Sequence, residues 1–206
     1  MPKPRNQNTR KPNKRIFILC EGGKTEPNYF NALIRNITYP GRIVEVKVVD
    51  TKKNTCKELV KEGKGLIESK SDDVWIVIDK DGYTKHPESF DMAAANKIKI
   101  AFSSISFEIW ILCHFEYTTR QFAKSEEVIQ YINHKKYFKD GYDKSDPNMF
   151  STLKDNLEEA FTNSLSLTKH HERCNNGKKI YTHNPYTDVY VLVKELLSLQ
   201  AKYAKR

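Results

Sequence analysis

Three carboxylates follow apolar runs of the kind that form buried strands. Glu21 directly follows the run R-I-F-I-L-C, and Asp79 and Asp81 follow the run V-W-I-V-I. Side chains alternate along an extended chain, so Asp79 and Asp81 point the same way and Lys80 points the opposite way. Ligands of open α/β sheets bind beyond the carboxyl ends of the strands. The spacing therefore predicts that the three carboxylates share one crevice at that edge.

A cluster of this kind requires a cation. Carboxylates held close together repel one another unless positive charge lies between them. Carboxylate oxygens are also the ligands that Mg²⁺ prefers, and Mn²⁺ accepts them as well. We therefore expect Glu21, Asp79 and Asp81 to bind Mg²⁺ or Mn²⁺. The alternative interpretation is that D-K-D-G forms an ordinary turn, in which Asp and Gly are common.

The segment after Glu21 ends in Gly23-Lys24-Thr25 and so resembles the end of a nucleotide-binding P-loop. That pattern requires a glycine five residues before Gly23, where this chain has Ile18. A P-loop is therefore excluded. Lys24 and the amides of a helix capped by Thr25 remain suited to binding a single phosphate.

Two further carboxylates and one histidine are candidates for the same site. Glu26 and Glu108 each lie in the first turn of a predicted helix, where a carboxylate interacts favourably with the helix dipole. A catalytic role is the other interpretation of both residues. His114 lies among apolar neighbours, which is more typical of a core histidine.

A second polar group lies near the carboxyl terminus. Its histidines and cysteine match no standard zinc-ligand spacing, and the surrounding cations would oppose a metal. We interpret the stretch as a basic loop that faces nucleic-acid phosphates, with a solvated surface loop as the alternative. The four cations of this loop are Lys169, Arg173, Lys178 and Lys179, and the other residues are His170, His171, Cys174 and His183.

Tyr137, Phe138 and Tyr142 stand beside lysines in the same half of the chain. Aromatic side chains next to cations are suited to stacking on bases. Packing between helices explains them equally well.

Short β-branched runs alternate with amphipathic segments in the first half of the chain. Strands that alternate with helices of this length predict an α/β fold with a parallel sheet and right-handed crossovers. The expected strands are residues 15–20, 43–49, 74–78 and 98–102, and the expected helices are 25–35, 56–69, 88–96 and one capped by Ser106.

Residues 117–206 change in character, because the pattern there is helical and no strand is expected. Asn184 as cap and Pro185 at the first helical position predict the start of the last helix. The expected organisation is a basic arm at 1–14, an α/β core at 15–116 and a helical addition at 117–206 packed on that core. Helices are expected at 125–136, 149–163 and 186–203.

The net charge of +9 is concentrated at the two ends of the chain. Residues 1–15 contain six cations and no acid, and residues 194–206 contain four cations and one acid. A basic arm attracts nucleic-acid backbones through counterion release. A solubilising tail without a specific role is the alternative.

The four cysteines are far apart and form no C-x-x-C pair, which favours reduced thiols in a cytoplasmic protein. The chain contains no run of about 18 apolar residues of the kind that spans a membrane. We therefore expect a cytoplasmic protein without a membrane partner.

Four blocks of the sequence together resemble the RloB-like family, which also includes AbiLii-type proteins. They are C-E-G-G-K-T-E-P-N-Y-F at 20–30, V-I-D-K-D at 77–81, S-I-S-F-E-I-W-I-L-C-H-F at 104–115 and N-P-Y-T-D-V at 184–189. One departure is that the family's S-N-P-C-F-E becomes S-S-I-S-F-E at 103–108.

The resemblance implies a Toprim-like fold and a metal-dependent nuclease effector of bacterial phage defence. It leaves the substrate open between RNA, including tRNA, and DNA, and it implies a partner ATPase encoded nearby. Glu21, Asp79 and Asp81 would hold the metal, Lys24 would neutralise phosphoryl charge, and Glu26 and Glu108 would assist. The alternative is a non-catalytic Toprim-like module that senses a partner and regulates the ATPase.

Overall fold

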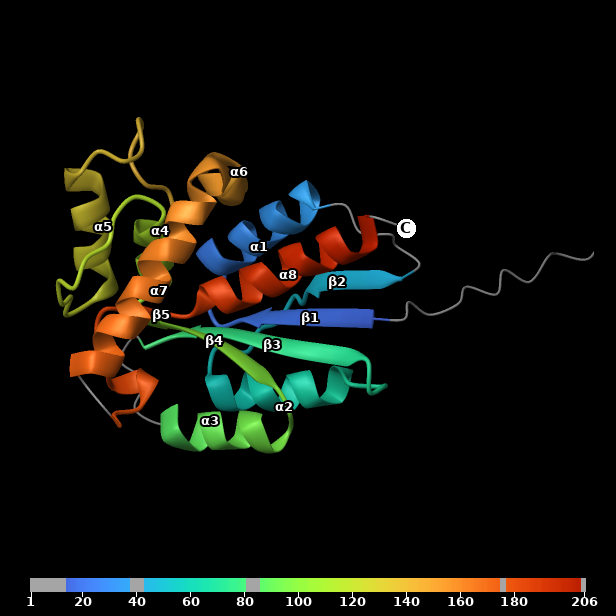
Figure 1. Ribbon diagram of the computed structural model, residues 1–206. Coiled ribbons are helices and arrows are strands. Elements are labelled where there is room, and N and C mark those ends of the chain that lie inside the picture. Colours follow the sequence, from blue (N-terminus) through green and yellow to red (C-terminus); the bar gives the residue numbers. More distant parts are fainter. Residues whose placement is uncertain (1–13, 38–42, 81–85, 175–176, 205–206) are drawn as a thin grey trace, which may run out of the picture.

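The computed structural model describes residues 14–37, 43–80, 86–174 and 177–204 (Figure 1). Its centre is a five-stranded sheet with the order β2-β1-β3-β4-β5. The first four strands are parallel and the last is antiparallel to β4, so the expected α/β fold with a parallel sheet is confirmed. The strands are β1 (Lys14–Cys20), β2 (Val44–Val48), β3 (Asp72–Asp79), β4 (Lys99–Ser104) and β5 (Tyr186–Thr187).

Helices cover both faces of the sheet. Figure 1 shows α1 (Thr25–Asn36) and α8 (Val189–Ala204) on one face, and α2 (Cys56–Leu66) and α3 (His86–Ala95) on the other. Alternate residues of the strands therefore enter different hydrophobic clusters, with Ile18 on the α1 side and Leu19 on the α2 side. Burial on both faces explains why the central strands are continuous apolar runs.

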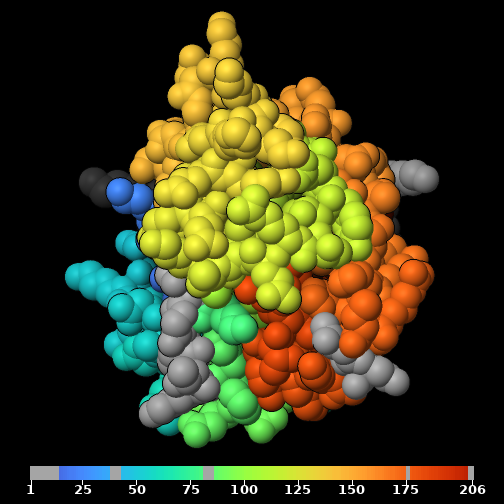
Figure 2. Space-filling model, turned by 90° about the vertical axis from the view of Figure 1, so that its left-hand side faces the viewer, coloured from blue at the N-terminus to red at the C-terminus, as the bar shows by residue number. Residues whose placement is uncertain are grey.

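The remaining helices gather at the carboxyl ends of the strands. In Figure 1, α4, α5 and α7 lie to the left of the sheet and α6 lies above α1, and in Figure 2, seen from the left, the segment between α5 and α6 projects upward. They are α4 (Glu108–Cys113), α5 (Ser125–His134), α6 (Met149–Leu153) and α7 (Leu157–Cys174), with 3₁₀ turns η1 (Lys154–Asn156) and η2 (Ile180–Thr182). Side chains of α4, α5, α6 and α7 join the same hydrophobic cluster as α1, so these helices pack on the core.

The direction of the connections produces a crevice between β1 and β3. From β1 the chain passes through α1 to β2 on one side, and from β2 it passes through α2 to β3 on the other side of β1. The two helices lie on opposite faces of the sheet (Figure 1). A reversal of this kind opens a crevice at the carboxyl ends of the two strands, which is where such folds bind ligands.

The expectation of no strand after residue 117 is wrong, and so is the expected start of the last helix. Tyr186 and Thr187 form β5, and α8 begins at Val189 rather than directly after Pro185. The Thr187 hydroxyl lies 2.9 Å from that of Ser103, and the backbone N–H of residue 188 donates to the carbonyl of Phe102 at 3.0 Å. Pairing with the edge of β4 outweighs the local cap-and-proline signal.

Two expected helix caps also differ from the structure. The cap residue of α1 is Lys24, and the Thr25 hydroxyl donates instead to the carbonyl of Lys144 at 3.5 Å. The cap residue of α4 is Phe107, and no side chain caps that helix, so Ser106 does not have the expected role.

Two segment boundaries differ as well. Helix α7 continues to Cys174, beyond the expected end at residue 163. Strand β1 begins at Lys14, within the expected arm, because Lys14 pairs with Val44 of β2 and its backbone N–H donates to the carbonyl of Ile43 at 2.9 Å. Among the described helices, none is both long enough and apolar enough to cross a membrane.

Candidate active site

Glu21 and Asp79 meet at the crevice between β1 and β3. The backbone N–H of Glu21 donates to the carbonyl of Val77 at 2.9 Å, which continues the pairing of β1 with β3 beyond the strand. The backbone N–H of Asp79 in turn lies 3.4 Å from Oε2 of Glu21. The structure thus brings together two of the three residues assigned to metal, through the carboxylate of Glu21 and the backbone of Asp79. The third, Asp81, lies outside the described residues.

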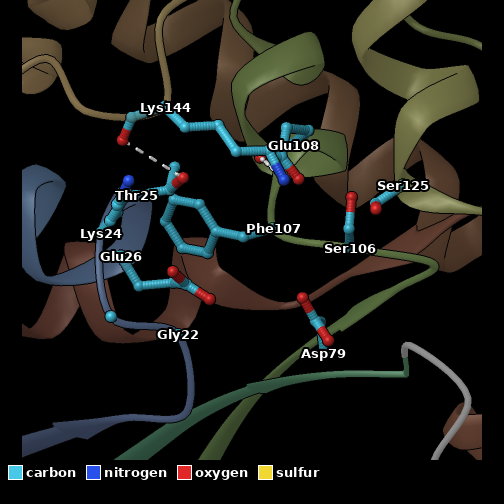
Figure 3. Close-up of a pocket in the computed structure, with 11 residues that line it drawn as sticks. Gly22, Lys24, Thr25, Glu26, Asp79, Ser106, Phe107, Glu108, Ser125 and Lys144 are labelled. Atoms are coloured by element: carbon cyan, nitrogen blue, oxygen red, sulfur yellow. Dashed lines mark hydrogen bonds and ion pairs between the residues drawn. The ribbon is translucent and has the colours of Figure 1, made fainter.

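A pocket adjoins this pair and extends toward the added helices (Figure 3). Its volume is about 180 Å³, far above the roughly 10–15 Å³ that admits one water molecule. Figure 3 shows Asp79 below, Glu26 to the left, Glu108 and Lys144 above, and Ser106 and Ser125 to the right. The lining residues are Gly22, Gly23, Lys24, Thr25, Glu26, Asp79, Ser106, Phe107, Glu108, Ser125 and Lys144.

Glu26 is a buried carboxylate that turns into this pocket, with 5% of its surface exposed. Burial, and to a smaller extent the charge of Glu108, raise the pKa of Glu26 to about 7. The close approach of Glu26 to the loop requires glycine at position 22, since a Cβ there would lie 2.2 Å from Oε2 of Glu26. Glu26 is therefore a buried acid on the pocket wall as well as a residue of the first turn of α1.

Glu108 is held by two residues from the segment between α5 and α6. Its Oε1 accepts a hydrogen bond from the Tyr142 hydroxyl at 3.2 Å and lies 3.4 Å from Nζ of Lys144. The Glu108 side chain is only 3% exposed, whereas that of Lys144 is 44% exposed. Burial is the main cause that raises the pKa of Tyr142, and the charge of Glu108 adds to it, so the tyrosine remains a hydrogen-bond donor.

The segment Tyr142–Pro147, here called the strap, is fastened along α1. The carbonyl of Ser145 accepts from Asn28 Nδ2 at 3.1 Å, and the carbonyl of Pro147 accepts from Arg35 Nη2 at 2.5 Å. Together with the bond from Thr25 to the carbonyl of Lys144, these contacts bring the strap to the pocket. Sequence reasoning did not find Lys144 as a site residue, because nothing local distinguishes this lysine from other lysines in polar loops.

Lys24 lies where the sequence predicted it, at the start of α1 on the wall of the pocket. It is exposed. With Lys144 it gives the pocket two cations beside the three carboxylates of Glu26, Asp79 and Glu108.

The four basic residues near the carboxyl terminus are exposed, but they do not form one loop. Lys169 and Arg173 lie one turn apart on α7, and only Lys178 and Lys179 follow the helix. The expectation of a basic loop is therefore wrong for the first pair, because α7 is longer than the sequence pattern indicated. A buried histidine pair lies in the same part of the chain.

His171 and His183 form that pair. Their rings stack with centroids 4.3 Å apart, and Nε2 of His171 lies 2.6 Å from the carbonyl of Pro185. Burial is the main cause that lowers the pKa of His183, and the charges of His171, Lys178 and Lys80 contribute. Because the charge of Lys80 acts on the pKa of His183, this basic region lies near the end of β3, where Asp79 is the last residue.

The aromatic residues singled out in the sequence pack inside the helical addition. Tyr137 stacks on Phe115 with ring centroids 4.5 Å apart, and Phe138 contacts Tyr142. All three contact the main hydrophobic cluster, so packing rather than an exposed stacking surface describes them. His114 is a core histidine, as expected: it is fully buried, and burial lowers its pKa to about 4.

The residues of the crevice fit a hard divalent cation in chemistry but do not complete its ligand set. Glu21 and Asp79 offer carboxylate oxygens, and the raised pKa of Glu26 reflects negative charge gathered away from water. Among residues 14–37, 43–80, 86–174 and 177–204, however, no three His, Cys, Asp or Glu side chains are grouped closely enough to hold a metal. Asp81, the third carboxylate that the sequence assigned to the metal, follows β3 and lies outside these residues.

Comparison with known proteins gives one match. A family model described as RloB-like protein matches residues 16–196. Neither the curated proteins nor the solved structures gave a significant match to the chain.

Proposed function

The chain belongs to the RloB-like protein family, and from this membership and the crevice between β1 and β3 we propose that it is a metal-dependent nuclease. The substrate would be RNA, including tRNA, or DNA, and the reaction would be hydrolysis of a phosphodiester bond. The proposal includes a Toprim-like character for the fold and a role in bacterial phage defence, both of which rest on the family resemblance.

The observation that carries the proposal is the contact between Glu21 and Asp79. These residues end neighbouring parallel strands at the point where the strand order reverses. Carboxylates that share the edge of a sheet where ligands bind favour a bound cation, because positive charge offsets their mutual repulsion. In this proposal Glu21, Asp79 and Asp81 hold Mg²⁺ or Mn²⁺.

A divalent cation held there would supply Lewis acidity and lower the pKa of a bound water. The protein's own residues would do the rest. Glu26, with a pKa of about 7, is suited to accept a proton from the attacking water near neutral pH. Lys24 would neutralise negative charge that develops on the phosphoryl oxygens.

The longer path of the nucleic acid would follow the exposed cations on and after α7. These cations are exposed, and they are Lys169, Arg173, Lys178 and Lys179. Lys80, which follows β3 at the crevice, also acts on the pKa of His183 in this region. Contacts of this kind bind the backbone irrespective of sequence. The partner ATPase belongs to the proposal through the family alone, and co-purification with the neighbouring gene product would test it.

The test of activity is cleavage of a mixed panel of tRNA, single-stranded RNA and duplex DNA with Mg²⁺, Mn²⁺ or EDTA. Metal-dependent products that disappear with Asp79→Asn would support the nuclease. Absence of cleavage in the presence of a co-purified ATPase, together with a change in ATP hydrolysis when the chain is added, would favour the non-catalytic regulatory module instead.

A further inference from the structure

The pocket beside the crevice has two chemically different sides. Asp79 and Glu26 occupy the side next to the end of β3, whereas Lys144, Ser106 and Ser125 lie on the side formed with the added helices (Figure 3). The second side offers an ammonium group and two hydroxyls. Groups of this type donate hydrogen bonds to anionic oxygens.

The Ser106 hydroxyl is a buried donor on that side whose hydrogen bonding is incomplete. Ser106 is 1% exposed, and its Oγ has no hydrogen-bond partner among the described residues although it lines the pocket. A buried hydroxyl without a partner is unfavourable by about 1–3 kcal/mol. A group of this kind on a pocket wall is explained if a ligand completes its hydrogen bonding.

Ser125 brings a helix N-terminus to the same place. It is the first residue of α5, a helix of ten residues, and it is 7% exposed. The N-terminal end of a helix carries partial positive charge and attracts anions. The helix end and the unpartnered hydroxyl of Ser106 are independent features that favour the same kind of ligand.

Glu108 would repel an anion if its charge were not balanced. Its Oε1 is bound by the Tyr142 hydroxyl and lies 3.4 Å from Lys144 Nζ, so this carboxylate holds the lysine at the pocket. Lys144 remains 44% exposed and keeps donors for a second partner, because an ammonium group has three. Glu108 is thus a positioning residue for Lys144.

We propose that Lys144, Ser106 and the N-terminus of α5 with Ser125 form a subsite that binds a phosphoryl group of the nucleic-acid substrate. The subsite rests on the proposed nuclease function and adds to it. A phosphoryl group bound there would hold the nucleic acid in a fixed position beside Glu26 and Asp79. It also gives the helical addition a direct part in substrate binding.

Binding measured without metal and without turnover tests the subsite. Fluorescein-labelled single-stranded RNA and DNA of 12 nucleotides are titrated in EDTA with protein carrying Asp79→Asn, and anisotropy gives Kd. Ser106→Ala in this background should raise Kd about 10- to 100-fold, the usual effect of one lost hydrogen bond to a charged group. Ser104→Ala is the matched control, since Ser104 is equally buried and unpartnered but does not line the pocket.

Lysine variants provide a second readout. Lys144→Met should raise Kd about 10-fold and reduce the magnitude of the salt slope of log K by about 0.7, the value for one phosphate contact in a single strand. Lys144→Arg should keep most of the affinity. Lys61→Met, an exposed lysine on α2, should change neither quantity beyond the small effect of net charge.

Competition tests whether the subsite binds free inorganic phosphate or only the phosphoryl groups of a nucleic acid. Displacement by inorganic phosphate that is weakened by Ser106→Ala supports a site that recognises the phosphoryl group alone. Displacement only by unlabelled oligonucleotide supports a site that requires a nucleic-acid chain. Equal Kd values for Ser106→Ala and Ser104→Ala with unchanged unfolding temperatures would overturn the subsite.

The subsite and the nuclease can fail separately. If Asp79→Asn cleaves at the wild-type rate, the metal assignment fails, whereas the EDTA binding data still decide the subsite. If Asp79→Asn abolishes cleavage and neither Ser106 nor Lys144 affects binding, the nuclease stands and the subsite is refuted.

Discussion

The backbone N–H of Asp79 lies 3.4 Å from Oε2 of Glu21, so the first residue after β1 contacts the last residue of β3. The contact uses only one oxygen of the carboxylate, and it does not depend on the Asp79 side chain. The charge of Asp79 can therefore be removed while the contact that joins the two strand ends is kept.

Asp79→Asn and Glu21→Gln should each lower cleavage at least about 100-fold, because loss of even the outer partners of metal ligands typically costs 10- to 100-fold. Both amides keep an acceptor oxygen, and removal of one charge relieves repulsion, so the free energy of unfolding should hold or rise slightly. Cleavage rate against Mg²⁺ concentration and urea unfolding measure the two effects. Wild-type cleavage by Glu21→Gln would remove Glu21 from the site.

Gly22→Ala and Gly23→Ala form a matched pair on the loop after β1. A Cβ at position 22 would meet the Glu26 carboxylate at 2.2 Å, whereas a Cβ at position 23 has no heavy atom within 4 Å. Gly22→Ala should displace Glu26 and lower cleavage up to about 100-fold, as a misplacement of about 1 Å can do. Its unfolding free energy should change little, since the carboxylate is the far end of a flexible side chain.

Gly23→Ala is the control for that variant. It should keep cleavage and leave the unfolding free energy unchanged or raised by about 0.4–1 kcal/mol, because alanine restricts the unfolded chain. Equal activity of the two variants would show that the position of Glu26 does not matter to the reaction.

Asp188 should make stability fall as pH rises. Its carboxylate accepts a hydrogen bond from the backbone N–H of Phe102 at 2.6 Å, and burial raises its pKa to about 7. The unfolded pKa is about 3.9, so between pH 4 and pH 7 the unfolded chain loses this proton while the folded protein keeps it. The unfolding free energy should decline across that interval by no more than about 4 kcal/mol from this group.

Asp188→Asn tests this assignment, because asparagine keeps the acceptor for Phe102 and cannot ionise. Urea unfolding at pH 4.5, 6 and 7.5 should give a smaller decline for the variant than for the wild type. Parallel pH profiles for the two proteins would show that Asp188 does not titrate in this range.

Deletion of residues 1–13 tests the basic arm without removing Lys14. Lys14 is the first residue of β1, and its side chain forms an ion pair with Asp73 of β3. The deletion removes Lys3, Arg5, Arg10 and Lys11. If all four contact duplex phosphates, the salt slope of log K should fall by about 3.6, with weaker binding at low salt. An unchanged slope would identify the arm as a solubilising tail.

The sequence predicted the features that arise from local patterns. Short apolar or β-branched runs identified the four parallel strands, and the residue after a run identified Glu21 and Asp79. The position of Glu26 in the first turn of α1 was also predictable, but its burial in a pocket was not, because the pocket is closed by residues from the far half of the chain.

The features that were not predicted depend on contacts between distant residues. Lys144 meets Glu108 across 36 positions, and the strap meets α1 across more than 100. β5 has only two residues, too few to display an alternating pattern, and it exists because Thr187 and Asp188 bond to β4. Side chains that serve as partners over such distances carry no signal in their own neighbourhood.

The strap also sets an order of events during synthesis. The ribosome delivers both acidic strand ends by residue 79, but Lys144 and the carbonyls that bind Asn28 and Arg35 emerge some 65 residues later. Chains are synthesised at about 5–20 residues per second. The opposite wall of the pocket is therefore synthesised several seconds after the acidic strand ends, so the proposed nuclease would complete its active site only after most of its chain had been made.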